Sequence, residues 1–274
     1  MKLNARVPVT AGLMALLLIS ATGCKRLRAN DQINKGVADF KNGRYESATN
    51  HFQNAVAIDP DNPNPHIYLA TTYASQVVPN LTTPENLKLA QQAKDGFLDV
   101  LKRDPNDVIA LKQLASLDRS IGNQEEAKEY GKKVIAVSPN DAESYYTIGT
   151  VDFYQAQANT KQVLGEENPP MTDKGDGNVK LSKAGCARLT ASNMPLVTEG
   201  MQYLQKAVDI DPNYENAMSI MSLMYRRKAD MECGNAVAIK SDLANSDLWA
   251  QKSMNARKEI ERIKEEKSKG GVTQ

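Results

Sequence analysis

The sequence predicts an all-α fold in which helix–turn–helix units repeat along the chain and stack into a solenoid. The first observation is a set of helix-like segments that each end just before a proline, at Pro60, Pro105, Pro139 and Pro212. Proline disfavours helical conformation at the residue before it, so each proline marks a helix end. The second observation is the spacing of 45, 34 and 73 residues, which equals one 34-residue period plus 11, one period, and one period plus 39. The chain therefore keeps one repeat length and carries two insertions.

The first repeat, residues 29–62, shows the unit most completely. Small residues lie where two antiparallel helices must approach closely, and larger apolar residues follow along the seam between them. A glycine after the first helix can adopt a positive φ, and a proline closes the second helix. The matching residues are Gly36, Gly43, Tyr45, Ala48, Phe52, Ala55 and Pro60. On these residues the unit resembles the tetratricopeptide repeat, and the resemblance implies a right-handed superhelix of about five repeats.

The resemblance covers about residues 29–228 and divides the chain into repeats. Their predicted bounds are 29–62, 63–107, 108–141, 142–214 and 215–228 onward. In the second repeat, Thr83-Pro84-Glu85 predicts an N-cap with proline in the first helical turn, so its extra residues lengthen the loop and the following helix. The fourth repeat carries the long insertion, over about 155–199. Residues 229–268 predict an irregular segment and then a capping helix that begins near Asp247, and residues 269–274 predict a disordered tail.

The N-terminus predicts a secretory targeting segment. Lys2 and Arg6 precede an uncharged run over residues 11–22, which is too short to span a bilayer and has the length of a signal-peptide core. The run ends in Ala21-Thr22-Gly23-Cys24, which resembles the lipobox of bacterial lipoproteins. The resemblance implies a signal peptide at 1–23, a lipid on Cys24 and a lipidated tether over 24–28. The alternative is an ordinary secretory signal with a chance cysteine.

The same resemblance gives an expected location. A cysteine that is diacylated and N-acylated carries enough acyl chain for stable membrane anchoring. Lys25 follows Cys24 where lipoproteins retained in the inner membrane carry aspartate, so the outer membrane of a diderm bacterium is favoured. We expect a lipid-anchored protein of the bacterial cell envelope that faces the periplasm.

Composition and motifs argue against nucleic-acid binding and against catalysis. The formal charge is +1, and loss of a leader with the two positive charges of Lys2 and Arg6 leaves −1, so nucleic acids are not expected partners. The chain has two histidines and lacks a Ser-His-acid set, an HExxH motif, a Walker loop and a CxxC pair. Asp173, Asp176 and Asn178 miss the EF-hand spacing and favour a plain turn. We expect no enzyme activity, no cofactor and no bound metal.

Cys186 and Cys233 are the thiols that remain once Cys24 is acylated. Both lie where the chain departs from the repeat pattern, so we expect both in irregular segments. An oxidising periplasm favours pairing of thiols that lie close together. We therefore predict a disulfide that joins the two insertions, worth about 4 kcal/mol in the chain-entropy model. Two buried free cysteines are the alternative.

The resemblance also implies a concave groove, because tetratricopeptide domains hold a partner's peptide or helix on first-helix side chains. Carried onto this chain, the candidate partner-binding residues are Tyr68, Lys112, Arg119, Tyr146, Phe153, Tyr154, Arg226 and Arg227. Tyrosine and arginine are enriched at interface hot spots, so a partner segment with apolar and acidic groups would suit this groove. Ile33 and Val37 stand where chaperone-tail-binding members need Asn and Lys, which argues against that specificity. Alternatively, the long insertion fills the groove.

These observations favour a non-catalytic scaffold that binds other envelope proteins or their peptide segments, for example as an accessory of an envelope assembly or secretion machine. One alternative is an enzyme or solute-binding protein whose site lies in the 155–199 insertion. Another is a structural protein that associates only with itself.

Overall fold

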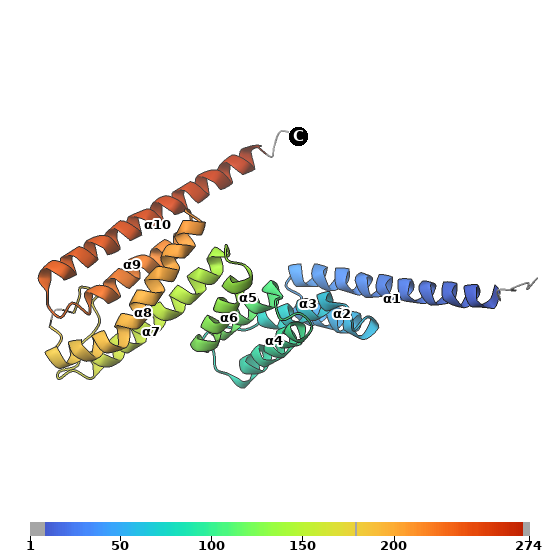
Figure 1. Ribbon diagram of the computed structural model, residues 1–274, viewed down its shortest axis with the longest axis horizontal. Coiled ribbons are helices and arrows are strands. Elements are labelled where there is room, and N and C mark those ends of the chain that lie inside the picture. The colour runs from blue at the N-terminus through green and yellow to red at the C-terminus, as the bar shows by residue number, and fades with distance from the viewer. Residues whose placement is uncertain (1–8, 179, 271–274) are drawn as a thin grey trace, which may run out of the picture. The chain divides into compact units, whose positions relative to one another are not determined.

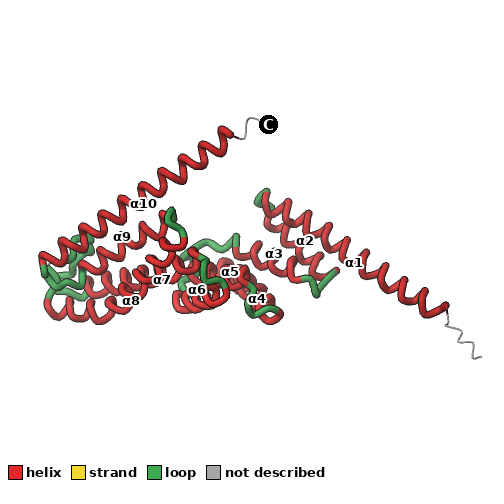
Figure 2. The backbone as a smooth tube through the Cα atoms, turned by 45° about the horizontal axis from the view of Figure 1, so that its top comes forward, coloured by secondary structure: helices red, strands yellow, loops and turns green. Residues whose placement is uncertain are grey.

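The computed structural model describes the backbone of residues 9–178 and 180–270, and the side chains of residues 25–178 and 180–268. Regular structure in this part of the chain is entirely helical (Figure 2), so the predicted all-α class is confirmed. The chain divides into two compact units, residues 1–121 and 122–274. The boundary falls inside the stretch predicted as the third repeat, between its two helices.

Unit 1 contains, in its described residues, the helices α1 (Val9–Lys41), α2 (Tyr45–Ile58), α3 (Pro63–Ala74), α4 (Pro84–Arg103) and α5 (Val108–Ser120) (Figure 1). Local sequence sets most of these bounds. Asn62, Thr83 and Asp107 each accept a hydrogen bond from a backbone N–H in the first turn of the helix that follows. Helices α2 and α4 end two residues before Pro60 and Pro105, as the proline positions predict.

The first helix pair packs through one glycine and one phenylalanine. A Cβ on Gly36 of α1 would lie 2.6 Å from Cε1 of Phe52 on α2, so only glycine leaves room for the ring. Phe52 is 1% exposed, and Ala48 and Ala55 are buried in the same cluster. Burying the ring stabilises the pair by about 2–3 kcal/mol. The seam predicted from the small and large residues of the first repeat is therefore present.

The start of α1 differs from the prediction. Residues 24–28, predicted as a tether ahead of the first helix, are part of α1. They contain neither glycine nor proline, so nothing in the local sequence stops the helix there. Among the described side chains of α1, Ala29 is the first that is buried, so packing begins where the first repeat was predicted to begin. The structure of residues 1–8 and the side chain of Cys24 lie outside the described part, and the signal peptide and lipid stay predictions.

Unit 2 contains, in its described residues, α6 (Gln124–Val137), α7 (Ala142–Gly165), α8 (Lys183–Ile210), α9 (Glu215–Ala229) and α10 (Ala236–Gly270). Helices α7, α8, α9 and α10 lie side by side in Figures 1 and 2. Asp141 and Ser182 cap α7 and α8, and helices α6 and α8 end two residues before Pro139 and Pro212. In the described part of the chain, no helix has the length and apolar character needed to cross a membrane.

Glycines also set the helix spacing in unit 2. A Cβ on Gly149 of α7 would lie 2.5 Å from Cγ of Leu204 on α8 and 2.9 Å from the carbonyl oxygen of Gly200. A Cβ on Gly200 would lie 2.3 Å from Cε of Met224 on α9. The core that forms around these contacts extends to Trp249 of α10, which is 7% exposed.

The long insertion is mostly helical, which corrects the predicted irregular segment over about 155–199. Helix α7 runs on to Gly165 and α8 starts at Lys183, so the non-helical link is confined to residues 166–182. The added turns bury Ala156 and Leu189 in the core, and this burial holds them as helix. In the same way α10 starts at Ala236 rather than near Asp247 and continues through residues 269–270 of the predicted tail. Residues 271–274 lie outside the described part.

Candidate interaction surface

On unit 1, the predicted contact residues lie on α3 and α5. Tyr68 of α3 stacks on Phe52 with ring centroids 5.4 Å apart, yet it stays 41% exposed. One part of its ring is therefore anchored by the core while the rest remains accessible. Lys112 and Arg119 lie on α5 and are half-buried.

On unit 2, helix α7 carries three of the predicted residues, and they have different surroundings. The Tyr146 ring lies 5.2 Å from that of Tyr214 and packs against the core. Phe153, also predicted as a contact residue, is 4% exposed and belongs to the core, so its ring is not accessible to a partner in this structure. Tyr154 is 49% exposed. Successive helical residues point about 100° apart, so the core takes the Phe153 ring and leaves Tyr154 at the surface.

Helix α9 carries the two predicted arginines, and both form hydrogen bonds with residues of the insertion. Arg227 is 5% exposed, and its Nη1 donates to Oδ2 of Asp173 at 2.6 Å and lies 3.1 Å from Oδ2 of Asp230. Arg226 Nη1 donates to the carbonyl oxygen of Gly175 at 2.9 Å. In this structure Arg227 is not accessible to a partner, because Asp173 from the insertion pairs with it.

The two carboxyl groups beside Arg227 have opposite pKa shifts. Burial disfavours the Asp173 carboxylate, but the hydrogen bond and charge of Arg227 outweigh burial and lower its pKa below the usual value. Burial raises the pKa of Asp230 to about 7, against the attraction of Arg227, and the neighbouring Asp173 charge adds to the rise. Asn178 Nδ2 also donates to Oδ1 of Asp230 at 2.7 Å. One carboxylate is thus firmly ionised, and the other titrates near neutral pH.

Tight turns fold the insertion onto α9. The side chains of Asp173 and Asp176 accept hydrogen bonds from the backbone N–H groups of Gly175 and Asn178, each two residues on. Gly177 has φ +86°, and a Cβ there would lie 2.7 Å from Cγ2 of Ile239 on α10. In the described residues, no group of three or more His, Cys, Asp or Glu side chains is placed to hold a metal ion.

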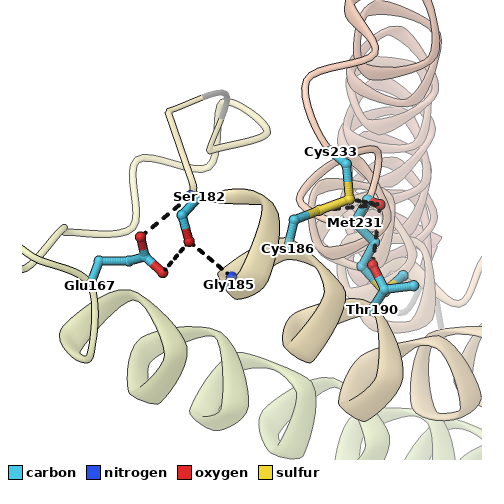
Figure 3. Close-up of a disulfide and its surroundings, with 7 residues drawn as sticks. All are labelled: Glu167, Ser182, Gly185, Cys186, Thr190, Met231 and Cys233. Atoms are coloured by element: carbon cyan, nitrogen blue, oxygen red, sulfur yellow. Dashed lines mark hydrogen bonds between the residues drawn. A yellow bond between two sulfur atoms is a disulfide. The ribbon is translucent and has the colours of Figure 1, made fainter.

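Cys186 and Cys233 form a disulfide with Cα atoms 5.6 Å apart, across a sequence separation of 47 residues (Figure 3). Cys186 lies in the first turn of α8, which corrects the prediction of an irregular segment, while Cys233 lies in the turn between α9 and α10. Cys186 is 1% exposed and Cys233 is exposed. The bond joins the start of α8, which follows the non-helical link 166–182, to the end of α9 that this link contacts.

One charged cluster inside unit 2 was not predicted from the sequence. Nζ of Lys128 on α6 lies 2.7 Å from Oδ1 of Asp152 on α7 and 2.7 Å from Oε2 of Glu199 on α8. Asp152 is fully buried, and burial raises its pKa to about 6 although Lys128 opposes the rise. The burial of Asp152 could have been predicted from sequence, because Asp152 lies three residues after Gly149 on the face of α7 that meets α8. Residue spacing does not show that Lys128 is its partner.

Unit 2 also has shallow depressions, of which two involve the insertion or the α9–α10 pair. One, of about 240 Å³, lies on the insertion and is lined by Lys174, Asp176 and Lys180 among others. The other, of about 380 Å³, lies between α9 and α10 and includes Leu223 and Met254, which are 36% and 52% exposed.

Comparison with known proteins supports the fold. The tetratricopeptide-repeat family model matches residues 36–77. A crystal structure of MamA is similar with a TM-score of 0.54 and 15% identity, covering 83% of this chain and 96% of that one. MamA from Desulfovibrio magneticus RS-1, residues 41 to the end, is similar with a TM-score of 0.55 and 18% identity, covering 85% of this chain and 96% of that one. No curated protein matches the sequence. The chain thus has the all-α fold of tetratricopeptide-repeat proteins, with a recognisable repeat at residues 36–77.

Proposed function

We propose that this protein is a non-catalytic scaffold that binds partner proteins through its first-helix surfaces and is anchored by a lipid on Cys24 in the bacterial cell envelope, facing the periplasm. Its partners would be other envelope proteins or their peptide segments. The repeat fold supports the scaffold role, because stacked helix pairs create extended surfaces rather than a single reaction centre.

One observation carries the proposal. Tyr68 and Tyr154 lie on first helices of the repeat pattern and remain 41% and 49% exposed, although each ring also contacts a buried phenylalanine. A tyrosine held on one side and accessible on the other loses little conformational entropy on binding. Such rings are typical anchors of protein interfaces.

The state of the insertion weighs against the alternative of an enzymatic or solute-binding site there. Asp173 pairs with Arg227, and the Asp176 side chain accepts its own loop's N–H group. These carboxylates stabilise the fold of the insertion onto α9, and they do not converge on a shared cavity.

Photocrosslinking in cells tests the scaffold role. A benzophenone amino acid at position 154 or 68 should capture a specific envelope protein, identified by mass spectrometry. The same probe at Leu87, which is 43% exposed on the second helix α4, is the matched control. The proposal fails if positions 68 and 154 capture nothing that position 87 does not also capture.

The anchor needs its own test. Labelling with a fatty-acid analogue should mark the wild-type protein and leave the Cys24→Ser variant unmarked, and the variant should leave the membrane fraction. An unlabelled wild-type protein would remove the lipid anchor while leaving the scaffold proposal intact.

A further inference from the structure

Residues 166–178, here called the strap, attach to the C-terminal end of α9 at three points. Asp173 pairs with Arg227 at 2.6 Å, the carbonyl oxygen of Gly175 accepts from Arg226 at 2.9 Å, and Asn178 donates to Asp230 at 2.7 Å. All three partners lie within residues 226–230. The strap therefore covers one short stretch of α9, where it buries Arg227 and bonds to Arg226, whose side chain stays 37% exposed and lies 3.6 Å from Asp247.

The strap is also tied to the start of α8. Ser182, the N-cap of α8, donates from Oγ to Oε1 of Glu167 at 3.0 Å, and its backbone N–H lies 3.3 Å from Oε2 of the same carboxylate (Figure 3). The backbone N–H of Leu181 donates to the carbonyl oxygen of Asn178 at 2.9 Å. Glu167 and Asn178 thus bond the two ends of the strap to Ser182 and Leu181 at the start of α8, while the backbone N–H of Met171 donates to the carbonyl oxygen of Leu164 on α7 at 2.9 Å. A displacement of the start of α8 would therefore pull on the strap through Ser182 and Leu181.

The disulfide connects the same two places. Cys186 lies one helical turn after Ser182, and Cys233 lies three residues after Asp230. Thr190 Oγ1, one further turn along α8, donates to the carbonyl oxygen of Met231 at 3.3 Å. Near this junction the disulfide is the one covalent link between the turn that carries the strap and the end of α9 that the strap covers.

The two cysteines differ in accessibility. Cys186 is 1% exposed, whereas Cys233 is exposed and adopts φ +51°, a left-handed conformation that is costly for a residue with a Cβ. A soluble thiol can therefore reach Cys233 first.

We propose that the Cys186–Cys233 disulfide is a redox latch for the strap: reduction by a dithiol lets the start of α8 separate from α9, and the strap lifts to uncover Arg226 and Arg227. The uncovered arginines would then accept carboxylates from a partner segment in place of Asp173. This last consequence rests on the proposed function, whereas the opening of the strap does not.

The exchange balances as a two-electron reduction. The thiolate of the dithiol attacks Sγ of Cys233 and forms a mixed disulfide, and Sγ of Cys186 leaves as a thiolate that takes up a proton. The second thiol of the reagent then loses its proton and attacks the reagent's other sulfur, which is bonded to Cys233 in the mixed disulfide. Cys233 leaves as a thiol, and the reagent becomes a cyclic disulfide.

Hydrogen exchange of the purified full chain tests the latch. Adding dithiothreitol should speed amide exchange in residues 171–178 by at least about tenfold, while exchange in α6 stays unchanged. Alkylation and mass measurement must show two free thiols in the same sample. Unchanged exchange in residues 171–178 with both thiols free would overturn the proposal.

Two variants separate the latch from general unfolding. Asp173→Asn removes the ion pair with Arg227 but leaves the disulfide in place, so residues 171–178 should stay protected until dithiothreitol is added. The double variant Cys186→Ser with Cys233→Ser should show fast exchange of residues 171–178 without reductant and no further change when dithiothreitol is added. A double variant that keeps its circular dichroism and thermal transition yet protects residues 171–178 like the oxidised wild type would also overturn it.

Discussion

Lys128 of α6 and Asp152 of α7 form an ion pair of 2.7 Å in which the lysine side chain is 8% exposed and the aspartate is fully buried. Glu199 of α8 completes the cluster at 2.7 Å from the same ammonium group. Burial alone would lower the pKa of Lys128, but the two carboxylates outweigh burial and raise it. Three helices of unit 2 thus contribute to one cluster around the Lys128 ammonium group. Removing that positive charge should lower the free energy of unfolding.

We expect Lys128→Met to lower the free energy of unfolding by about 3–5 kcal/mol, because it leaves the Asp152 carboxylate buried without its partner. Urea denaturation measures the loss. Lys132→Met is the matched control, since Lys132 pairs with Glu129 at 3.2 Å on the surface and should matter by less than about 0.5 kcal/mol. Adding Asp152→Asn to Lys128→Met should recover most of the loss. A double variant no more stable than Lys128→Met would contradict this account.

Asp230→Asn should change how stability depends on pH. The folded pKa of Asp230 is raised to about 7 from a usual value of 3.8, so the folded protein binds a proton that the unfolded chain has lost. The stability from this group is present below the unfolded pKa and is lost as pH rises through 7. The free energy of unfolding of the asparagine variant, relative to that of wild type, should rise by about 2–3 kcal/mol between pH 5 and pH 8.

Urea denaturation at both pH values measures this gain. Asp209→Asn, a change at an exposed carboxylate near the end of α8, is the control and should show no comparable gain. An equal response of the two variants would argue against a near-neutral titration of Asp230.

Gly149→Ala should destabilise unit 2 by about 1–3 kcal/mol. The new methyl group would meet Leu204 at 2.5 Å and the backbone oxygen of Gly200 at 2.9 Å, so α7 and α8 must separate. Gly165→Ala on the same helix has open space around it, and it should be neutral or stabilise by up to about 1 kcal/mol. Thermal denaturation of both variants measures this difference in stability. If helix propensity alone decided stability, the two variants would not differ.

Phe153→Ala and Tyr154→Ala should differ sharply although the residues are adjacent. Phe153 is 4% exposed in the core, so its truncation should cost about 3–5 kcal/mol. Tyr154 is 49% exposed, and its loss should cost less than about 1 kcal/mol. Equal losses of unfolding free energy would place both rings in the core and leave Tyr154 unsuitable as a partner contact.

The local parts of the structure were predictable from sequence because local interactions decide them. Helices α2, α4, α6 and α8 all end two residues before a proline of the predicted set. The close approach of Gly36 to Phe52 follows from the repeat pattern, because a side chain at that position would block the seam. Local interactions did not predict that most of the long insertion is helical. Its helical turns depend on burial of Leu189 and its neighbours in a core built from distant segments.

The sequence by itself determined the all-α class and most helix ends, and it predicted the pairing of Cys186 with Cys233. Tertiary structure decided which charged groups meet. Arg227 was predicted to face a partner, but Asp173, 54 residues away in the chain, neutralises it inside the protein. Likewise Lys128 meets Glu199 across 71 residues. A buried charge must find a counter-charge whose position depends on how helices pack, and residue spacing alone does not encode that packing.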